Sequence, residues 1–373
     1  MKPSLLLLAS SPALAAYFRP AEWGAQSSVI MAWPSGDNPA YHNAPDDLSA
    51  ATEDISNIAA AVAKFEPVTL LVVQSRLADA QAQFADRSNI TLLPIATYPT
   101  LDLWMRDMAP TFVLDRSNTT GQLAGVDYNF NGWGGKFPTG SCLSLASLLS
   151  YHMKVPRVDG ALVSEGGSLE VDGEGTLLVT ESSVLIDNRN PGTTKAQAEA
   201  AFEKTLGVTK TIWIPGRRGS DITDGHIDGL ARFIAPGRVL LSRPSSLEGG
   251  GPFVDTYREA RAILANTTDA RGRVLHVTEI AEAELENIGA DKELVQQVQD
   301  GQKDYPSLTY VNYVMVNGGI VFAAFGDKEA DAAALKLIQG LYPDRTVEVV
   351  NTQTLAFLGG GIHCSTQEVP ASE

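Results

Sequence analysis

The sequence of 373 residues has few cysteines, few histidines and a shortage of positive charge. It contains only two cysteines, so at most one disulfide, between Cys142 and Cys364, can form within the chain. The five histidines show no His-x-x-x-His spacing and there is no Cys-x-x-Cys, which argues against a metal centre. Lys and Arg number 28 against 44 Asp and Glu, a net charge of −16. This charge argues against nucleic acid or an anionic membrane as partner, and mildly favours cationic substrates, although solubility also explains it.

Long apolar runs and low-complexity segments are missing too. The apolar stretch from Leu5 to Ala9 is too short to span a bilayer. It follows Lys2 and precedes Ala13-Leu14-Ala15, which fits a small-x-small cleavage pattern. These features predict a signal peptide over residues 1–16, with a buried first strand as the alternative. No linker or change in composition divides residues 17–373, which we expect to form a single domain.

A signal peptide predicts a secreted protein, whereas an uncleaved N-terminus would leave the chain cytoplasmic. Glycosylation sequons at Asn89, Asn118 and Asn266 agree with secretion. In an oxidising compartment the two cysteines either form a disulfide or stay reduced, with Cys142 buried and Cys364 reactive. The sequence leaves both states open.

Strand-like segments alternate with helix-like segments, which predicts an α/β fold. Strands are expected at residues 28–33, 110–114, 176–180, 238–242 and 320–324, several of them after a Gly or Pro turn signal. Helical periodicity covers residues 47–65, 194–206, 254–265 and 328–341, with Asp46 or Asp47 as cap of the first helix. The spacing of the strands predicts five similar units, closed about a pseudo-fivefold axis.

Cys364 follows the glycines Gly359, Gly360 and Gly361 near the C-terminus. A lone cysteine is usually a small core residue. A thiol beside a flexible glycine turn, however, can be open to a substrate and close to backbone N–H groups. A catalytic Cys364 would need a base and carboxylates from elsewhere in the chain.

Three upstream clusters offer those groups. Asp107 comes just before an expected strand, where sites on α/β folds gather, although an Arg-Asp ion pair is the simpler alternative. Glu165 precedes two glycines that allow a close backbone approach, or only a β-turn. His226 and Asp228 would face one pocket if their segment is extended. A salt-bridged histidine and a metal ligand are the alternatives for His226.

A cysteine nucleophile, a histidine acid/base and several carboxylates suit a planar cationic electrophile. Carboxylates bind a guanidinium in bidentate fashion and would orient its carbon for attack by a thiolate. Acidic neighbours raise the pKa of a thiol, however. A thiolate at Cys364 therefore needs a positive partner, either His226 as an imidazolium or the bound cation.

In this order, the clusters resemble the agmatine deiminase family, also called the Porphyromonas-type peptidylarginine deiminase family. The resemblance extends over nearly the whole mature chain, in blocks at residues 20–23, 31–34, 104–107, 130–136, 165–168, 172–176, 188–191, 225–228, 310–313, 317–319 and 359–364. It implies the pentein fold, a five-bladed α/β propeller with a central site, and guanidine hydrolysis without metal or cofactor. The family core starts at Pro20, so the residues before it are extra, which supports the predicted signal peptide.

The resemblance also implies roles for the candidate residues. Cys364 would attack the guanidinium carbon, and His226 would protonate the leaving ammonia and then activate water. Asp107 and Asp228 would bind the guanidinium nitrogens, and Glu165 would assist His226 or the substrate. Further residues are expected at the substrate: Trp104, Trp133 and Gly361.

Three residues depart from the family pattern, Ala109, Glu170 and Gly229, and would reshape the pocket that selects the substrate tail. We expect a secreted hydrolase that converts agmatine to N-carbamoylputrescine and ammonia, with a small cationic guanidine as its partner. Deimination of peptidyl-arginine to citrulline, a non-catalytic secreted binding protein with oxidised cysteines, and a metal-dependent amidohydrolase are the alternatives. The sequence leaves open whether the chain forms a homo-oligomer.

Overall fold

The computed structural model describes residues 15–38, 44–95, 101–117, 121–137, 142–248, 250–300, 302 and 304–372. Residues 1–14, which make up most of the predicted signal peptide, and the sequon residue Asn118 lie outside these ranges. Within the ranges, no helix is both long and apolar enough to cross a membrane.

The strands of the described residues form five separate sheets in a mixed α/β fold. Two sheets have four strands. One has the order β17 (Gln367–Pro370), β2 (Gln26–Ala32), β3 (Val68–Val73), β4 (Ile90–Ile95). The other has the order β1 (Tyr17–Phe18), β5 (Thr111–Asp115), β6 (Gln122–Asp127), β7 (Arg157–Asp159). The other three sheets have three strands each: β10 (Lys210–Ile214), β9 (Thr176–Thr180), β8 (Glu170–Val171); β11 (Ala231–Ala235), β12 (Arg238–Arg243), β13 (His276–Ala281); and β14 (Val314–Val316), β15 (Gly319–Ala324), β16 (Thr346–Asn351).

All five sheets contain the same unit of three strands and one helix. The first strand pairs antiparallel with the second, and the second pairs parallel with the third, as in β11, β12 and β13. The same order holds for β5–β7, β8–β10 and β14–β16, and for β17 followed by β2 and β3. A parallel pair needs a crossover, which a helix provides in each unit. The five similar units predicted from the sequence are therefore present.

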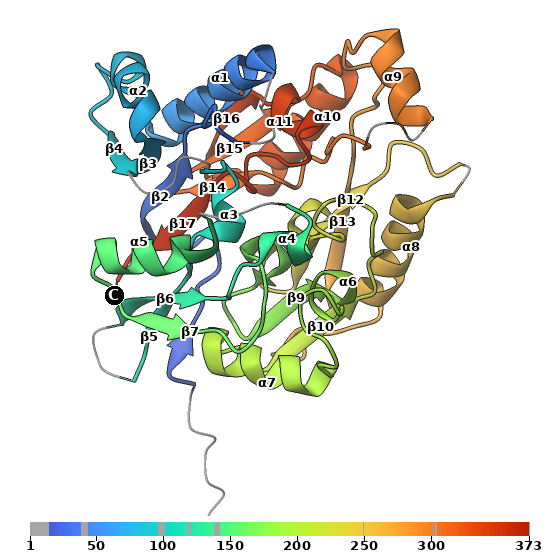
Figure 1. Ribbon diagram of the computed structural model, residues 1–373. Helices are drawn as coiled ribbons and strands as arrows, with labels where there is room; N and C mark the ends of the chain where they lie inside the picture. Colours follow the sequence, from blue (N-terminus) through green and yellow to red (C-terminus); the bar gives the residue numbers. More distant parts are fainter. Residues whose placement is uncertain are drawn as a thin grey trace, which may run out of the picture.

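The helices that cross between parallel strands lie on the outside of the sheets (Figure 1). The five crossover helices are α1 (Pro45–Val62), α5 (Leu145–Met153), α7 (Lys195–Leu206), α8 (Pro252–Ala265) and α10 (Lys328–Leu341). The remaining helices are α2 (Leu77–Gln83), α3 (Met105–Met108), α4 (Gly132–Gly135), α6 (Glu181–Val184), α9 (Lys292–Gln299) and α11 (Gln353–Phe357), with short 3-10 turns η2 (Gln74–Arg76), η3 (Cys142–Ser144), η4 (Gly166–Ser168) and η5 (Ile227–Gly229). All the predicted strands and helices are found within a few residues of their expected bounds.

The predicted cap of α1 is wrong. Ala44 occupies the cap position and makes no side-chain cap bond, while Pro45 begins the helix. Proline suits this position because its missing N–H would have no helical partner there. Asp46 and Asp47 lie in the first turn, where their charges favour the positive end of the helix dipole.

The C-terminal strand β17 pairs with β2, a strand from the early part of the chain (Figure 1). Val29 of β2 lies opposite Glu368 of β17. Behind this sheet α1 buries Ile55 and Ile58 completely in the largest apolar cluster. Each such side chain contributes about 1.5–3 kcal/mol relative to exposure. This packing fixes the segment before β17, which carries Cys364.

Candidate active site

The predicted site residues stand on segments that each precede the first strand of one unit. Asp107 comes before β5, Glu165 before β8, Asp228 before β11 and Cys364 before β17. The fifth segment, before β14, carries Asn312, to which the sequence analysis gave no role. Because the five units share one topology, residues at equivalent places can meet although they are far apart in sequence. Hydrogen bonds and ion pairs between these segments show that they meet.

Cys364 lies half-buried in the turn between α11 and β17. Asn312 Nδ2 donates to its sulfur at 3.2 Å, and the thiol lies 3.5 Å from Asp228 Oδ2. The glycines before it are required by close approaches, since a Cβ on Gly361 would lie 2.6 Å from Asn312 Oδ1 and one on Gly360 would lie 2.4 Å from the Trp104 ring. Burial first, and then the charges of Asp228 and Asp107, raise the pKa of the Cys364 thiol well above its ordinary value.

His226 lies between two carboxylates in the same part of the molecule. Its Nδ1 is 3.8 Å from Asp107 Oδ1 and its Nε2 is 3.5 Å from Glu165 Oε2. Burial alone would lower the pKa of the imidazole, but Asp107, Glu165 and Asp228 outweigh it and raise the pKa to about 9. At neutral pH the ring therefore carries a proton that it can donate.

The segment of His226 and Asp228 is not extended, so the condition set for their facing one pocket is not met. Residues 227–229 form the 3-10 turn η5, and His226 is the residue before it. The hydroxyl of Thr223 accepts a hydrogen bond from the His226 N–H at 3.0 Å and fixes the start of the turn. The two side chains nevertheless line one cavity, because the turn presents both toward Cys364.

Asp107 is held by two donors, Trp133 from its own unit and Gly167 from the next unit. Trp133 Nε1 donates to Oδ2 at 2.8 Å, and the Gly167 N–H donates to Oδ1 at 3.0 Å. The pKa of Asp107 is raised overall. Burial and the charges of Asp228 and Glu165 raise it, and together they outweigh the charge of His226, which lowers it. A Cβ on Gly167 would lie 2.5 Å from His226 Nδ1, so only glycine allows this approach of backbone, carboxylate and imidazole.

Glu165 is fully buried behind His226 and forms an ion pair with Arg189. Arg189 Nε donates to both carboxylate oxygens, at 2.8 and 3.1 Å, and Arg189 Nη1 donates to Asp224 Oδ2 at 2.7 Å. Burial would raise the pKa of Glu165, but the contacts with His226 and Arg189 lower it. Glu165 thus remains a carboxylate beside His226. Breaking a buried pair of this kind costs about 3–5 kcal/mol.

His363 joins Asp228 to Glu22, and neither His363 nor Glu22 was given a role from the sequence. Its Nδ1 lies 2.7 Å from Asp228 Oδ2 and its Nε2 lies 2.8 Å from Glu22 Oε2. Arg232 Nη2 donates to the same Glu22 oxygen at 2.8 Å. Burial would raise the pKa of Asp228, but His363, His226 and Arg106 lower it to about 2. The position of His363 next to Cys364 was the one signal in the sequence.

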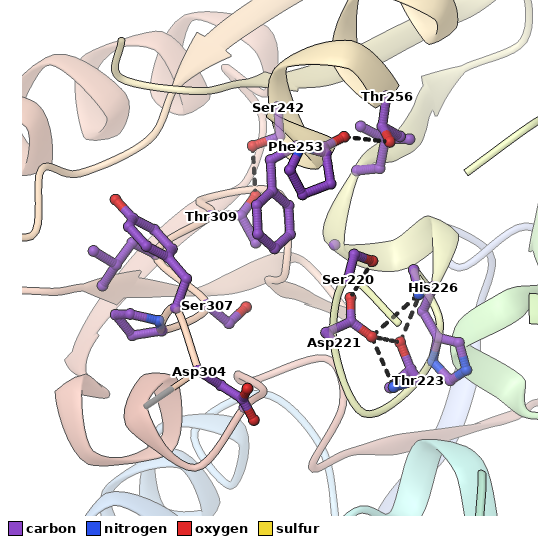
Figure 2. A pocket seen from close by; sticks show the side chains of 18 of the residues that line it. Ser220, Asp221, Thr223, His226, Ser242, Phe253, Thr256, Asp304, Ser307 and Thr309 are labelled. Atoms are coloured by element: carbon purple, nitrogen blue, oxygen red, sulfur yellow. Dashed lines mark hydrogen bonds between the residues drawn. The ribbon is translucent and has the colours of Figure 1, made fainter. Parts of the chain in front are cut away.

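A cavity of about 550 Å³ connects these groups to solvent. Cys364, His226 and Asp228 line it, together with the predicted substrate-binding residues Trp104 and Trp133. The other predicted residues do not line it: Asp107 and Glu165 lie behind His226, and Gly361 packs on Asn312. Figure 2 shows His226 at one side of this cavity, next to Thr223 and Asp221.

Of the three residues that depart from the family pattern, one lines the cavity and two do not. Gly229 lines it, as expected of a residue that shapes the substrate pocket. Glu170 does not line it. Its carboxylate accepts hydrogen bonds from Arg232 Nε and from the Phe233 N–H, each at 2.9 Å, inside the protein. Ala109 is likewise buried, away from the cavity wall.

Both cysteines are thiols rather than a disulfide. Cys142 packs in an apolar cluster with Leu145 and Met105, and burial raises the pKa of its thiol to about 12. This arrangement argues against the predicted alternative of an oxidised, non-catalytic binding protein. Among the described residues, no group of three or more His, Cys, Asp and Glu side chains is arranged to hold a metal ion.

Comparison with known proteins places these observations in a family. A family model described as Porphyromonas-type peptidyl-arginine deiminase matches residues 18–370. Agmatine deiminases of Pseudomonas savastanoi pv. phaseolicola and Stutzerimonas stutzeri are 37% and 35% identical, each alignment covering 98% of both chains. A solved agmatine deiminase structure from Enterococcus faecalis has a TM-score of 0.81 at 30% identity, covering 95% of this chain and 96% of that one.

Proposed function

The chain belongs to the Porphyromonas-type peptidyl-arginine deiminase family, and on that premise we propose that it hydrolyses agmatine to N-carbamoylputrescine and ammonia. The observation that carries this proposal is the cavity into which the Cys364 thiol, the His226 imidazole and the Asp228 carboxylate all face. A nucleophile, a proton donor and a carboxylate in one acid-walled cavity suit a guanidinium as the reacting group. The reaction is hydrolysis of a C–N bond in a linear amidine.

Substrate binding activates the nucleophile. Asp228, which lines the cavity, accepts hydrogen bonds from the guanidinium, and Asp107 adds its negative charge from beside His226. In the free enzyme the carboxylates raise the pKa of the Cys364 thiol. The bound cation reverses this effect, because a positive charge next to the sulfur favours the thiolate, and the thiol proton leaves to solvent. The thiolate then lies beside the guanidinium carbon that it attacks.

Ammonia leaves in the first half-reaction. The sulfur forms a bond to the guanidinium carbon, and the protonated His226 donates its proton to one of the terminal nitrogens. The C–N bond breaks, ammonia departs, and an S-alkylthiouronium remains on Cys364. Glu165 and Asp107 flank the ring and keep it protonated until this step.

Water completes the cycle. His226, now neutral, takes a proton from a water molecule that attacks the thiouronium carbon. The C–S bond breaks, the carbon retains the new oxygen as the carbonyl of N-carbamoylputrescine, and the second proton of the water passes to the departing Cys364 sulfur. His226 has regained its proton and Cys364 is again a thiol, so the site returns to its starting charge.

Ammonia release from agmatine, free arginine and a peptide with a C-terminal arginine, measured side by side, tests the substrate. We expect agmatine to be hydrolysed with the highest kcat/KM. Release from the peptide alone would overturn the assignment in favour of peptidyl-arginine deimination. Trapping of a Cys364 adduct with a mass change equal to the amidine group would support the covalent step, and its absence in a rapid-quench experiment would oppose it.

Three further expectations remain proposals. The five sheets with equivalent topology are the blades of a pentein propeller, with the pre-strand segments at its axis. Residues 1–16 are a signal peptide and the protein is secreted, which N-terminal sequencing of the protein recovered from the native host would test. Light scattering of the purified protein would decide whether it forms a homo-oligomer.

A further inference from the structure

The cavity reaches well beyond Cys364 and His226. A volume of about 550 Å³ falls in the range of about 300–1,000 Å³ that holds drug-sized ligands. A guanidinium alone would leave most of this space empty. A second part of its wall, which we call the distal pocket, consists of five residues: Ser242, Phe253, Glu282, Tyr305 and Thr309.

Glu282 is the charged group of the distal pocket. It directly follows β13, and its Oε1 accepts a hydrogen bond from Ser242 Oγ at 2.7 Å. The Ser242 hydroxyl lies 2.7 Å from Thr309 Oγ1, so the two hydroxyls form one small network below the carboxylate. Burial raises the pKa of Glu282, whereas Ser242 and the charge of Arg243 lower it. Within the described chain no cationic side chain forms an ion pair with Glu282.

The other carboxylates in the cavity wall are already engaged or are exposed. Asp221 Oδ1 accepts hydrogen bonds from the N–H and the hydroxyl of Thr223, at 2.7 and 2.6 Å. Asp102 accepts from the N–H of the next residue at 2.7 Å. Glu248 and Asp304 are exposed to solvent. Glu282 differs from these carboxylates because its hydrogen bond comes from a hydroxyl, and within the described chain no backbone N–H donates to it, so its charge is available to a ligand.

Two aromatic side chains line the distal pocket together with Glu282. The rings of Phe253 and Tyr305 are 6.1 Å apart between centroids, and the two residues are 42% and 44% exposed although they are large and apolar. Aromatic faces attract a cation, most strongly where it is partly desolvated. In Figure 2, Phe253 and Ser242 lie across the pocket from His226.

The distal pocket is within reach of a short substrate tail. Thr309 precedes Asn312 by three residues with a turn between them, and the Asn312 amide contacts the Cys364 sulfur at 3.2 Å. A turn of four residues spans less than about 7 Å between its ends, so the pocket lies on the order of 10 Å from the thiol. The guanidinium and the ammonium of an aminobutyl guanidine, fully extended, are separated by a similar length.

We propose that Glu282, together with the rings of Phe253 and Tyr305, binds the ammonium at the far end of an aminoalkyl guanidine while Cys364 attacks the guanidinium. This assignment rests on the proposed function and names the residue that selects the tail. The carboxylate favours a tail ending in an ammonium over a neutral tail. It disfavours arginine, because the α-carboxylate of arginine would approach a second negative charge.

The test compares agmatine with butylguanidine, which has the same chain and no ammonium, in the wild type and in three variants. Glu282→Gln removes the charge and keeps an oxygen that accepts from Ser242, so the fold is retained. Glu282→Asp restores the charge on a shorter side chain. Glu284→Gln is the matched control, because Glu284 is exposed two residues away and does not line the cavity. The measured quantity is the ratio of kcat/KM for agmatine to kcat/KM for butylguanidine.

A charge-assisted hydrogen bond corresponds to roughly a 10- to 100-fold preference. We therefore expect Glu282→Gln to lower the ratio at least tenfold, mainly through KM for agmatine. Glu282→Asp should restore part of the ratio, and Glu284→Gln should keep the wild-type value. An unchanged ratio in Glu282→Gln, or an equal loss on both substrates, would overturn the assignment while leaving the deiminase function in place. Failure of the wild type to hydrolyse either guanidine would overturn both.

Discussion

Replacement of His363 tests whether its contact keeps Asp228 ionised in the site. The ring bridges the carboxylates of Asp228 and Glu22 at 2.7 and 2.8 Å and is 1% exposed. His363→Leu fills a similar space and removes both hydrogen bonds. His363→Gln keeps one amide donor, so it separates the loss of the imidazole ring from the loss of the hydrogen bond to Asp228.

The structure sets the size of the effect. Burial would raise the pKa of Asp228, yet His363 and its neighbours hold it at about 2, compared with 3.8 for an ordinary aspartate. A return to 3.8 alone would leave Asp228 ionised at pH 6. Burial, however, raises the pKa of a carboxyl by up to about 3–5 units when it is not offset, and a pKa about one unit above the assay pH leaves roughly a tenth of the group ionised. We therefore expect kcat/KM for agmatine to fall by up to about tenfold at pH 6 in His363→Leu, and less in His363→Gln.

The pH dependence of kcat/KM distinguishes a change in the ionisation of Asp228 from general damage to the fold. In the Leu variant burial dominates, so the pKa of Asp228 rises and activity should recover as the pH increases from 6 to 9. Ammonia release across this range, with thermal unfolding of each variant as a check of folding, provides the assay. A loss of the same factor at every pH, or a loss below about threefold, would refute the argument that His363 keeps Asp228 ionised.

Three more predictions concern the reaction centre. Cys364→Ala and Cys364→Ser should each remove almost all turnover, and wild-type rates in the Ser variant would refute thiolate attack. The pKa of His226, about 9 in the fold and 6.5 ordinarily, gives about 3 kcal/mol of stability that is fully present below pH 6.5 and is lost as the pH rises through 9. Denaturation from pH 6 to 10 should show this loss in the wild type and not in His226→Gln, and a flat wild-type profile would contradict it. Gly167→Ala should lower kcat more than tenfold while the fold persists, because its Cβ would lie 2.5 Å from His226 Nδ1. Gly340→Ala, on α10 with open space around it, is the control that should leave kcat unchanged.

The repeated elements could be predicted because local sequence determines them. Alternation of apolar residues and the preceding turn glycines locate strands such as β9 and β12, and the 3.6-residue period locates α10 up to its stop at Tyr342. The cap of α1 was mispredicted because two aspartates looked equivalent to a cap while Pro45 fixed the start of the helix. The turn at residues 227–229 could not be predicted because a segment rich in glycine and aspartate has no clear period.

The partners of the site residues could not be predicted from local sequence. His363 and Asp228 are 135 residues apart, and His363 and Glu22 are 341 apart. Only the meeting of segments that are distant in sequence creates these contacts. The same holds for Glu165, whose place behind His226 depends on Arg189 from another segment. Residue type and motif order indicated which side chains take part, whereas their order around the thiol depends on how the units pack.

The distribution of charge in the site explains why the site should bind a cation. The buried arginines pair with the outer carboxylates, Arg189 with Glu165 and Arg232 with Glu22 and Glu170. Asp107 and Asp228, which lie nearest the thiol, have histidines as their partners. A guanidinium entering here adds positive charge where negative charge is in excess and lowers the pKa of the thiol by the same interaction. Binding of agmatine, or of a guanidinium inhibitor, should therefore release a proton, and calorimetry in buffers of different ionisation enthalpy would measure it. Proton release that persists in Cys364→Ser would place the ionisation on another group and contradict activation of the thiol by the substrate.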